Sequence, residues 1–267
     1  MINLSKTAGF TLWFDPDRLD IQSGADLIFS KEARRYQDLQ DVLAYPVEFE
    51  PAQAVYWNYK LANAGRHIEQ LKPMHLTLGL VMLPAMKIGR EYIKTHGHYH
   101  EAMPGSPFSY PEVYTLYHGK LLLYLQRRAR FDRYELDDCI LYEMRPGCSI
   151  MIPPGYAHIL INPSDQPALM AGLYCLDSVH EYRMVVETRG GGYYFIEQDG
   201  KFTPTPNPHY QNLPALRQVD RLAGTCFSPP DPQQPLWSSF IANPDRYRFL
   251  ASPADTQKQF NPEDLRI

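Results

Sequence analysis

The stretch GCSIMIPPGYAHILIN, residues 147–162, decides the fold class. Its first half is a short apolar run typical of a buried strand, and the Pro154-Gly155 pair then predicts a turn that reverses the chain. His158 follows at the start of a second apolar run, ILI. We therefore expect a strand, a tight turn, and a second strand that begins with a histidine.

The same pattern extends on both sides of this stretch. From about residue 75 to residue 188, roughly seven short apolar or alternating runs are separated by Gly, Pro and Asp. Examples are HLTLGLVMLP, EVYTLYHGKLLLYLQ and ALMAGLYCL. Short strands with turn signals at this spacing predict a sandwich or jelly roll, so the fold class is all-β dominated.

Composition excludes several classes of protein. Of the 267 residues, 44% are hydrophobic and 21% are charged, which is ordinary for a globular chain. The net charge of -4, without clustered Lys and Arg, predicts neither a nucleic-acid partner nor a membrane partner. Because the first residues lack the features of a secretory signal, we expect a cytoplasmic protein. The four scattered cysteines are expected to be free thiols.

The N-terminal part, residues 1–70, is expected to form an extension that packs on the barrel. Within it, SKEARRYQDLQDVLAY has Tyr36, Leu39 and Val42 at helical spacing, with Ser30 as an N-cap, and predicts a helix. A second helix or a long strand is expected from Ala52 to Leu71.

The remaining chain divides into two parts by composition. Residues 71–200 are expected to form the barrel with its functional site. Residues 201–267 contain the Pro-rich runs TPTPNP and FSPPDPQQP, which predict an irregular C-terminal extension.

A dense histidine cluster, KTHGHYH, occupies residues 94–100. Side chains at positions i and i+2 of a strand share one face, so His96, His98 and His100 are expected to point the same way. Two imidazoles at that spacing can bind one metal, and the residues alone leave open which two. Glu112 begins the next strand, and its carboxylate is a natural third ligand.

These segments resemble the cupin superfamily. Residues 147–162 match the second cupin motif, G-x5-P-x-G-x2-H-x3-N, at every fixed position. The first motif is matched in part by His98, His100, Glu112 and Gly119. Tyr92 stands where that motif usually has glycine, and the eleven-residue connection EAMPGSPFSYP is longer than usual. We expect this connection to border the pocket.

A closer resemblance is to the cupin-type glucose-6-phosphate isomerases of archaea and some bacteria. It covers roughly residues 80–200. It rests on the runs THGHYH and PEVY, on the PPGYAH turn, and on YCLDSVHEY, which ends at Tyr182. The resemblance implies a homodimeric jelly roll that interconverts glucose 6-phosphate and fructose 6-phosphate in glycolysis and gluconeogenesis.

The resemblance also implies roles for individual residues. One divalent metal per chain is expected; Fe²⁺ is preferred, and Mn²⁺, Ni²⁺ and Zn²⁺ suit the same ligands. The implied metal ligands are His98, His100, Glu112 and His158. The implied catalytic residues are Glu112 and His180. The implied substrate-binding residues are Thr95, Gly97, Tyr114, Tyr174 and Tyr182. His96 is expected at the pocket rim, and Lys94 or Arg90 are further candidates to hold the phosphate.

Two other functions remain open at this stage. Another metal cupin enzyme, such as a dioxygenase, would use the same ligands, and a sugar-binding cupin would need no catalysis. A dioxygenase would not need Thr95 or the segment from Tyr174 to Tyr182, which favours the isomerase.

Overall fold

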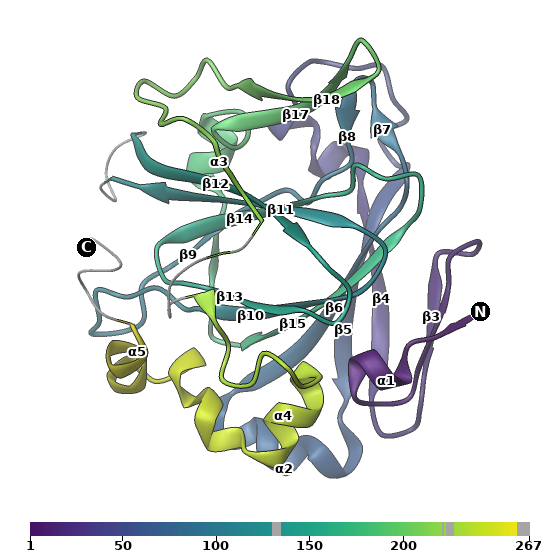
Figure 1. Ribbon diagram of the computed structural model, residues 1–267, viewed down its shortest axis with the longest axis vertical. Coiled ribbons are helices and arrows are strands. Elements are labelled where there is room, and N and C mark those ends of the chain that lie inside the picture. The colour runs from purple at the N-terminus through teal and green to yellow at the C-terminus, as the bar shows by residue number, and fades with distance from the viewer. Residues whose placement is uncertain (130–134, 221, 223–226, 261–267) are drawn as a thin grey trace.

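The computed structural model describes residues 1–129, 135–220, 222 and 227–260, and this part consists mainly of β-strands (Figure 1). The larger of its two main sheets has six strands in the order β13-β10-β15-β6-β5-β4, all antiparallel to their neighbours. Their bounds are Ser149–Ile152 (β13), Glu112–His118 (β10), Ala168–Cys175 (β15), Leu76–Leu83 (β6), Ala54–Asn63 (β5) and Ile28–Arg35 (β4).

A second sheet faces the first across the barrel interior. It has the order β14-β11-β12-β19, and these strands are Tyr156–Ile161 (β14), Leu121–Arg128 (β11), Leu136–Met144 (β12) and Arg217–Val219 (β19). Buried side chains of both sheets, such as Leu116 on β10 and Leu123 on β11, meet in one core. The two sheets form a β-barrel of jelly-roll type, which confirms the predicted all-β dominated fold class.

Smaller strand groups complete the β structure. The pair β9 (Tyr99–His100) and β16 (His180–Glu181) lies near the barrel, and a third group has the order β18-β17-β8-β7. The latter strands are Lys201–Pro206 (β18), Tyr193–Gln198 (β17), Glu91–Tyr92 (β8) and Lys87–Ile88 (β7). The N-terminal group is β1 (Ile2–Asn3), β2 (Leu12–Asp15) and β3 (Asp20–Ser23).

Short helices lie outside the barrel. The α-helices are Ser5–Ala8 (α1), Ile68–Leu71 (α2), Arg183–Glu187 (α3), Leu236–Ala242 (α4) and Pro253–Gln259 (α5). The 3₁₀ helices are Tyr36–Asp38 (η1), Gln40–Val42 (η2), Gly65–His67 (η3), Lys72–Met74 (η4) and Pro244–Leu250 (η6). Among the described residues, no helix has the length and apolar character needed to cross a bilayer.

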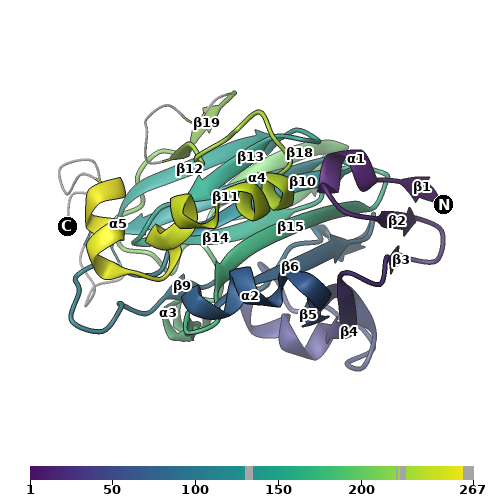
Figure 2. The ribbon, with the colours of Figure 1, turned by 90° about the horizontal axis from the view of Figure 1, so that it is seen from below.

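Within the six-stranded sheet, strand β10 is buried on both faces. Tyr114 and Leu116 on β10 point into the barrel core, whereas the alternating Val113 and Tyr117 belong to a second core on the outer side. Figure 2 shows α4 and α5 across that outer side, and Trp237 of α4 packs into the second core. Residues 236–259, expected to be irregular, therefore form helical cover for the sheet.

The predicted helix after Ser30 is wrong. Residues 28–35 form β4, in which Ser30 pairs with Lys60 of β5, and the chain then makes the two 3₁₀ turns η1 and η2. Side chains three residues apart line up on a 3₁₀ helix, so the spacing of Tyr36, Leu39 and Val42 also suits consecutive 3₁₀ turns. All three are buried.

The sheet continues across the boundary that the sequence suggested near residue 70. β5 precedes this boundary and β6 follows it, yet Tyr59 on β5 pairs with Leu80 on β6. A second helix or a long strand was expected over residues 52–71. The structure has the strand β5 there, followed by the short helix α2. As predicted, Cys139, Cys148 and Cys175 are free thiols, and Cys226 lies outside the described residues.

Asn162, the last fixed residue of the motif in residues 147–162, joins the barrel strands. Its side-chain amide is buried and donates to the carbonyl oxygens of Leu83, Pro84 and Gln166 at 3.2, 2.9 and 2.8 Å. These carbonyls end β6 and precede β15, so one amide ties neighbouring strand ends together.

Candidate active site and metal centre

A cavity of about 250 Å³ lies on the barrel side of the six-stranded sheet. Its floor comes from alternate residues of the strands, among them Glu112 and Tyr114 of β10, because successive side chains of a strand point to opposite faces. Its wall comes from residues 95–98, from His158 and Leu160 of β14, and from the segment that carries His180.

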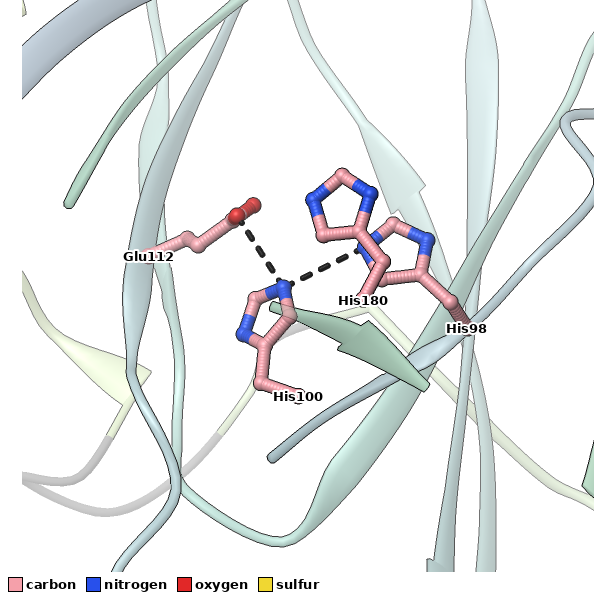
Figure 3. A group of neighbouring side chains, drawn as sticks. All are labelled: His98, His100, Glu112 and His180. Atoms are coloured by element: carbon pink, nitrogen blue, oxygen red, sulfur yellow. Dashed lines mark hydrogen bonds and ion pairs between the residues drawn. The ribbon is translucent and has the colours of Figure 1, made fainter. Parts of the chain in front are cut away.

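Figure 3 shows four side chains whose nitrogen and oxygen atoms converge, and three of them, His98, Glu112 and His180, line this cavity. One atom each of His98, His100, Glu112 and His180 lies within 4.8 Å of the others. The Nε2 atoms of His98 and His100 are 3.2 Å apart, and His100 Nε2 is 3.2 Å from Glu112 Oε1. Donors that bind one ion at about 2.1 Å lie roughly 3 Å apart, so these spacings fit a shared metal.

His158 lies beside this group. Its ring centroid is 4.4 Å from that of His98, and its Nε2 is 3.8 Å from Glu112 Oε2. Both ring nitrogens of His158 are buried, and neither has a hydrogen-bond partner in the described part of the chain. A buried imidazole without partners is costly unless another group binds it, which makes His158 a candidate metal ligand.

The backbone holds these histidines in register. His98 and His158 form an isolated antiparallel bridge, and His100 on β9 pairs with His180 on β16. Gly97, between the histidines, has φ +80°, and a Cβ there would lie 2.4 Å from Cγ1 of Ile159. A side chain at position 97 is therefore excluded both by conformation and by space.

A hydrogen bond fixes the orientation of His100. Its Nδ1 lies 2.6 Å from the carbonyl oxygen of Tyr110, so Nδ1 donates and Nε2 is left with its lone pair toward the cluster. The tautomer that this bond selects is the one that suits metal binding.

The protonation states follow from burial and neighbouring charges. Burial would raise the pKa of Glu112, but His100, His158 and a hydrogen bond from Tyr114 outweigh it and lower this pKa to about 2. Burial lowers the pKa of His158 to about 3 and that of His98 well below its usual value. For His100, burial opposes protonation, but the Glu112 carboxylate outweighs it and raises the pKa. The cluster thus offers an ionised carboxylate at Glu112 and neutral imidazoles at His98 and His158, the forms that bind metals.

The residues expected to contact substrate all line the same cavity. These are Thr95, Gly97, Tyr114, Tyr174 and Tyr182. Burial raises the pKa of Tyr174 to about 12, so this phenol remains a hydrogen-bond donor near neutrality. The Tyr182 hydroxyl lies 3.0 Å from Nδ1 of His180. His96 also lines the cavity and packs edge-on against Tyr182, outside the four-residue donor group.

Two expectations about the surroundings of the site are wrong. Lys94 does not face the cavity: it is buried, its Nζ lies 2.5 Å from Glu91 Oε1, and it donates to the carbonyl of Val42. Arg90 donates to the carbonyl of Glu197, also away from the cavity.

The connection EAMPGSPFSYP does not line the cavity either. Met103, Phe108 and Tyr110 bury their side chains in the outer core, and the hydroxyl of Ser109 accepts the backbone N–H of Gly155. The insertion is therefore packed against the barrel, where it supports His100 through the Tyr110 carbonyl.

Sequence reasoning missed the part of the cavity that β4 and β5 supply. Arg34, Tyr56, Asn58 and Lys60 line it. The alternation of Tyr56, Asn58 and Lys60 is a strand signal, but the helical spacing after Ser30 concealed the strand that brings Arg34 to the cavity.

Comparisons with known proteins give one family. A family model described as "Glucose-6-phosphate isomerase (GPI)" matches residues 33–211. A glucose-6-phosphate isomerase of Thermococcus litoralis is 28% identical over 198 residues, which are 73% of this chain and 95% of that protein. One of Pyrococcus abyssi is 29% identical over 144 residues, 54% of this chain and 69% of that protein.

Among solved structures, similarity extends to an oxalate oxidase in complex with glycolate, with TM-score 0.28, 17% identity, and coverage of 38% of this chain and 41% of that one. The Drosophila melanogaster CENP-C cupin domain has TM-score 0.29 and 11% identity, and covers 57% of this chain and 81% of that one.

Proposed function

Since the chain belongs to the glucose-6-phosphate isomerase family, we propose that it interconverts glucose 6-phosphate and fructose 6-phosphate, with one divalent metal bound by His98, His100, Glu112 and His158. The observation that carries this proposal is the convergence of imidazoles and one carboxylate inside a cavity lined by hydroxyl groups. A sugar phosphate is rich in hydroxyls, and such a cavity offers many partners for them.

The donor set fits a metal. Its spacings suit a shared ion, and the two unpartnered ring nitrogens of His158 favour this residue as the fourth ligand. His180 also belongs to the convergent group, and its Nδ1 lies 3.0 Å from the Tyr182 hydroxyl; we assign it to proton movement by the family resemblance. When bound, a divalent metal would act as a Lewis acid toward the substrate oxygens. Fe²⁺ is the ion that we expect, by family resemblance.

The reaction requires a hydrogen to leave one of the carbons C1 and C2 and to reach the other. We assign Glu112 and His180 to this proton movement, since a carboxylate and an imidazole can each accept and return a proton. Tyr114, whose hydroxyl donates to Glu112, would keep that carboxylate oriented. Thr95, the backbone of Gly97, Tyr174 and Tyr182 would orient the sugar and its phosphate.

A coupled assay tests the proposal. Purified protein supplied with Fe²⁺ or Mn²⁺ should convert fructose 6-phosphate to glucose 6-phosphate, which glucose-6-phosphate dehydrogenase then reports as NADPH. The matched control is His100→Ala, which removes one ligand and should abolish the signal. If metal-loaded protein forms no glucose 6-phosphate, the proposal is wrong, and oxygen uptake by the same preparation would favour an oxygenase instead.

A further inference from the structure

The two ends of the cavity carry charged side chains of opposite sign. The end on β10 holds the Glu112 carboxylate and the imidazole cluster. The end on β4 and β5 holds two cations, Arg34 and Lys60. A sugar phosphate is also asymmetric, because its carbonyl and its dianionic phosphate lie at opposite ends of the carbon chain.

Arg34 and Lys60 differ in how much of their positive charge a neighbouring carboxylate neutralises. Lys60 Nζ lies 2.5 Å from Glu32 Oε2, so a carboxylate already neutralises much of its charge. Within the described residues, the guanidinium of Arg34 has no ion pair, and its Nε is buried without a hydrogen-bond partner. A buried donor without an acceptor is costly, and at a cavity wall a bound ligand or an ordered water can supply the acceptor.

The pairing of β4 with β5 places the Arg34 side chain on the face of the sheet that lines the cavity. Arg34 pairs with Tyr56 and Glu32 with Asn58, and directly paired residues share one face of an antiparallel sheet. Tyr56 and Asn58 line the cavity, as does Arg34 itself. Arg35, the next residue, does not line the cavity, and its guanidinium donates to the carbonyl of Ala52.

Arg34 also lies within electrostatic reach of the reaction centre. Its charge acts on His180 and Tyr182, and the charge of Glu112 acts on the same two side chains from the other end. His180 and Tyr182 are thus within electrostatic reach of both the cation and the carboxylate. Asp38 is an acid that acts on His96 together with Arg34, but it accepts the backbone N–H of Arg35.

We propose that Arg34 binds the phosphate group of the substrate, so that the sugar lies along the cavity between Arg34 and Glu112. The inference rests on the proposed function. A guanidinium presents a planar fork of donors that matches two phosphate oxygens, which gives orientation as well as affinity. Thr95 would add a donor, since its hydroxyl oxygen accepts the N–H of Leu160 and leaves the hydroxyl proton available.

The test compares Arg34→Gln with Arg35→Gln, which removes an equal charge from the neighbouring residue outside the cavity. Arg34→Gln should raise KM for fructose 6-phosphate about tenfold to a hundredfold, with kcat changed by less than about threefold, because it removes binding energy distant from the reacting carbons. Arg35→Gln should leave both constants near those of the wild type. Arg34→Lys keeps the charge without the fork and should give an intermediate KM.

A second measurement does not depend on turnover. Inorganic phosphate should raise the melting temperature of the wild type and of Arg35→Gln, and this increase should be lost in Arg34→Gln. The inference is overturned if Arg34→Gln retains the wild-type KM, if both variants change alike, or if Arg34→Gln is still stabilised by phosphate. A wild-type protein without isomerase activity would overturn the proposed function instead, and the phosphate measurement would still decide whether Arg34 binds the anion.

Discussion

The imidazole of His180 stacks on that of His98, with ring centroids 3.8 Å apart and the planes at 28°. His180 belongs to β16, a strand of two residues whose partner is β9. The stacked ring therefore enters the donor cluster from a separate segment, whereas His158 enters it from the barrel wall. Which of these two histidines completes the metal site is open to direct measurement.

His158→Ala should lower metal affinity by at least about tenfold to a hundredfold, the range seen when even supporting residues of a metal site are lost. His180→Gln should retain about one metal per chain, because it leaves the four proposed ligands, His98, His100, Glu112 and His158, in place. Metal content after dialysis, measured by mass spectrometry of the dissolved ion, distinguishes the two. His96→Ala, a cavity residue outside the donor group, is the control and should keep its metal.

Loss of metal from His180→Gln with retention in His158→Ala would reverse the assignment of the fourth ligand. Loss from His96→Ala with retention in a His100 variant would show that the wrong pair of histidines had been chosen.

The transferred hydrogen should exchange with solvent. If Glu112 or His180 carries a proton between C2 and C1, that proton can exchange with water while it resides on the side chain. Isomerisation in heavy water should then place deuterium on C1 or C2 of the product, which nuclear magnetic resonance or mass spectrometry detects.

A shielded cavity could slow this exchange, so the variants Glu112→Asp and His180→Gln complete the experiment. Both should lower kcat. Unlabelled product together with near-normal turnover of both metal-loaded variants would contradict the proton route and favour a direct hydride shift.

Phe108 should contribute to stability and not to substrate affinity. It lies in the connection EAMPGSPFSYP and is only 3% exposed in the outer core. Phe108→Ala should therefore lower the free energy of unfolding by about 3 kcal/mol, as for other large side chains deleted from a core. KM should stay within about twofold of the wild type. Urea unfolding and steady-state kinetics check the two parts, and a large change in KM with unchanged stability would place the loop at the cavity after all.

The buried ion pair of Lys94 with Glu91 should behave as a structural unit. Lys94→Met leaves the Glu91 carboxylate buried without its cation, which should cost about 3 kcal/mol of unfolding free energy. The double variant Glu91→Gln/Lys94→Met removes both charges and should recover part of that loss. Urea unfolding measures both variants. An increase in KM at unchanged stability would instead mean that Lys94 contacts the phosphate.

Local patterns in the sequence were sufficient to find much of the site. The i, i+2 spacing of His98 and His100 and the turn before His158 depend only on neighbouring residues, so these features could be predicted without the fold. His180 approaches His98 because β16 pairs with β9, a contact between distant segments that only the resemblance had suggested.

Arg34 could not be found in this way. Its approach to the cavity depends on the pairing of β4 with β5. The residues after β4 have apolar side chains at a spacing that a helix and successive 3₁₀ turns share, so local periodicity favoured the wrong element.

The hydrogen-bonding arrangement of Asn162 has a consequence for the chemical ageing of the protein. Asparagine deamidates when the backbone nitrogen of the next residue attacks its side-chain amide, and that residue here is Pro163, whose nitrogen carries no hydrogen. The three carbonyls that Asn162 holds also engage the same amide group. Asn162 should therefore resist conversion to aspartate. The hydrogen bonds through which it connects the ends of β6 and β15 should persist over long periods at elevated temperature.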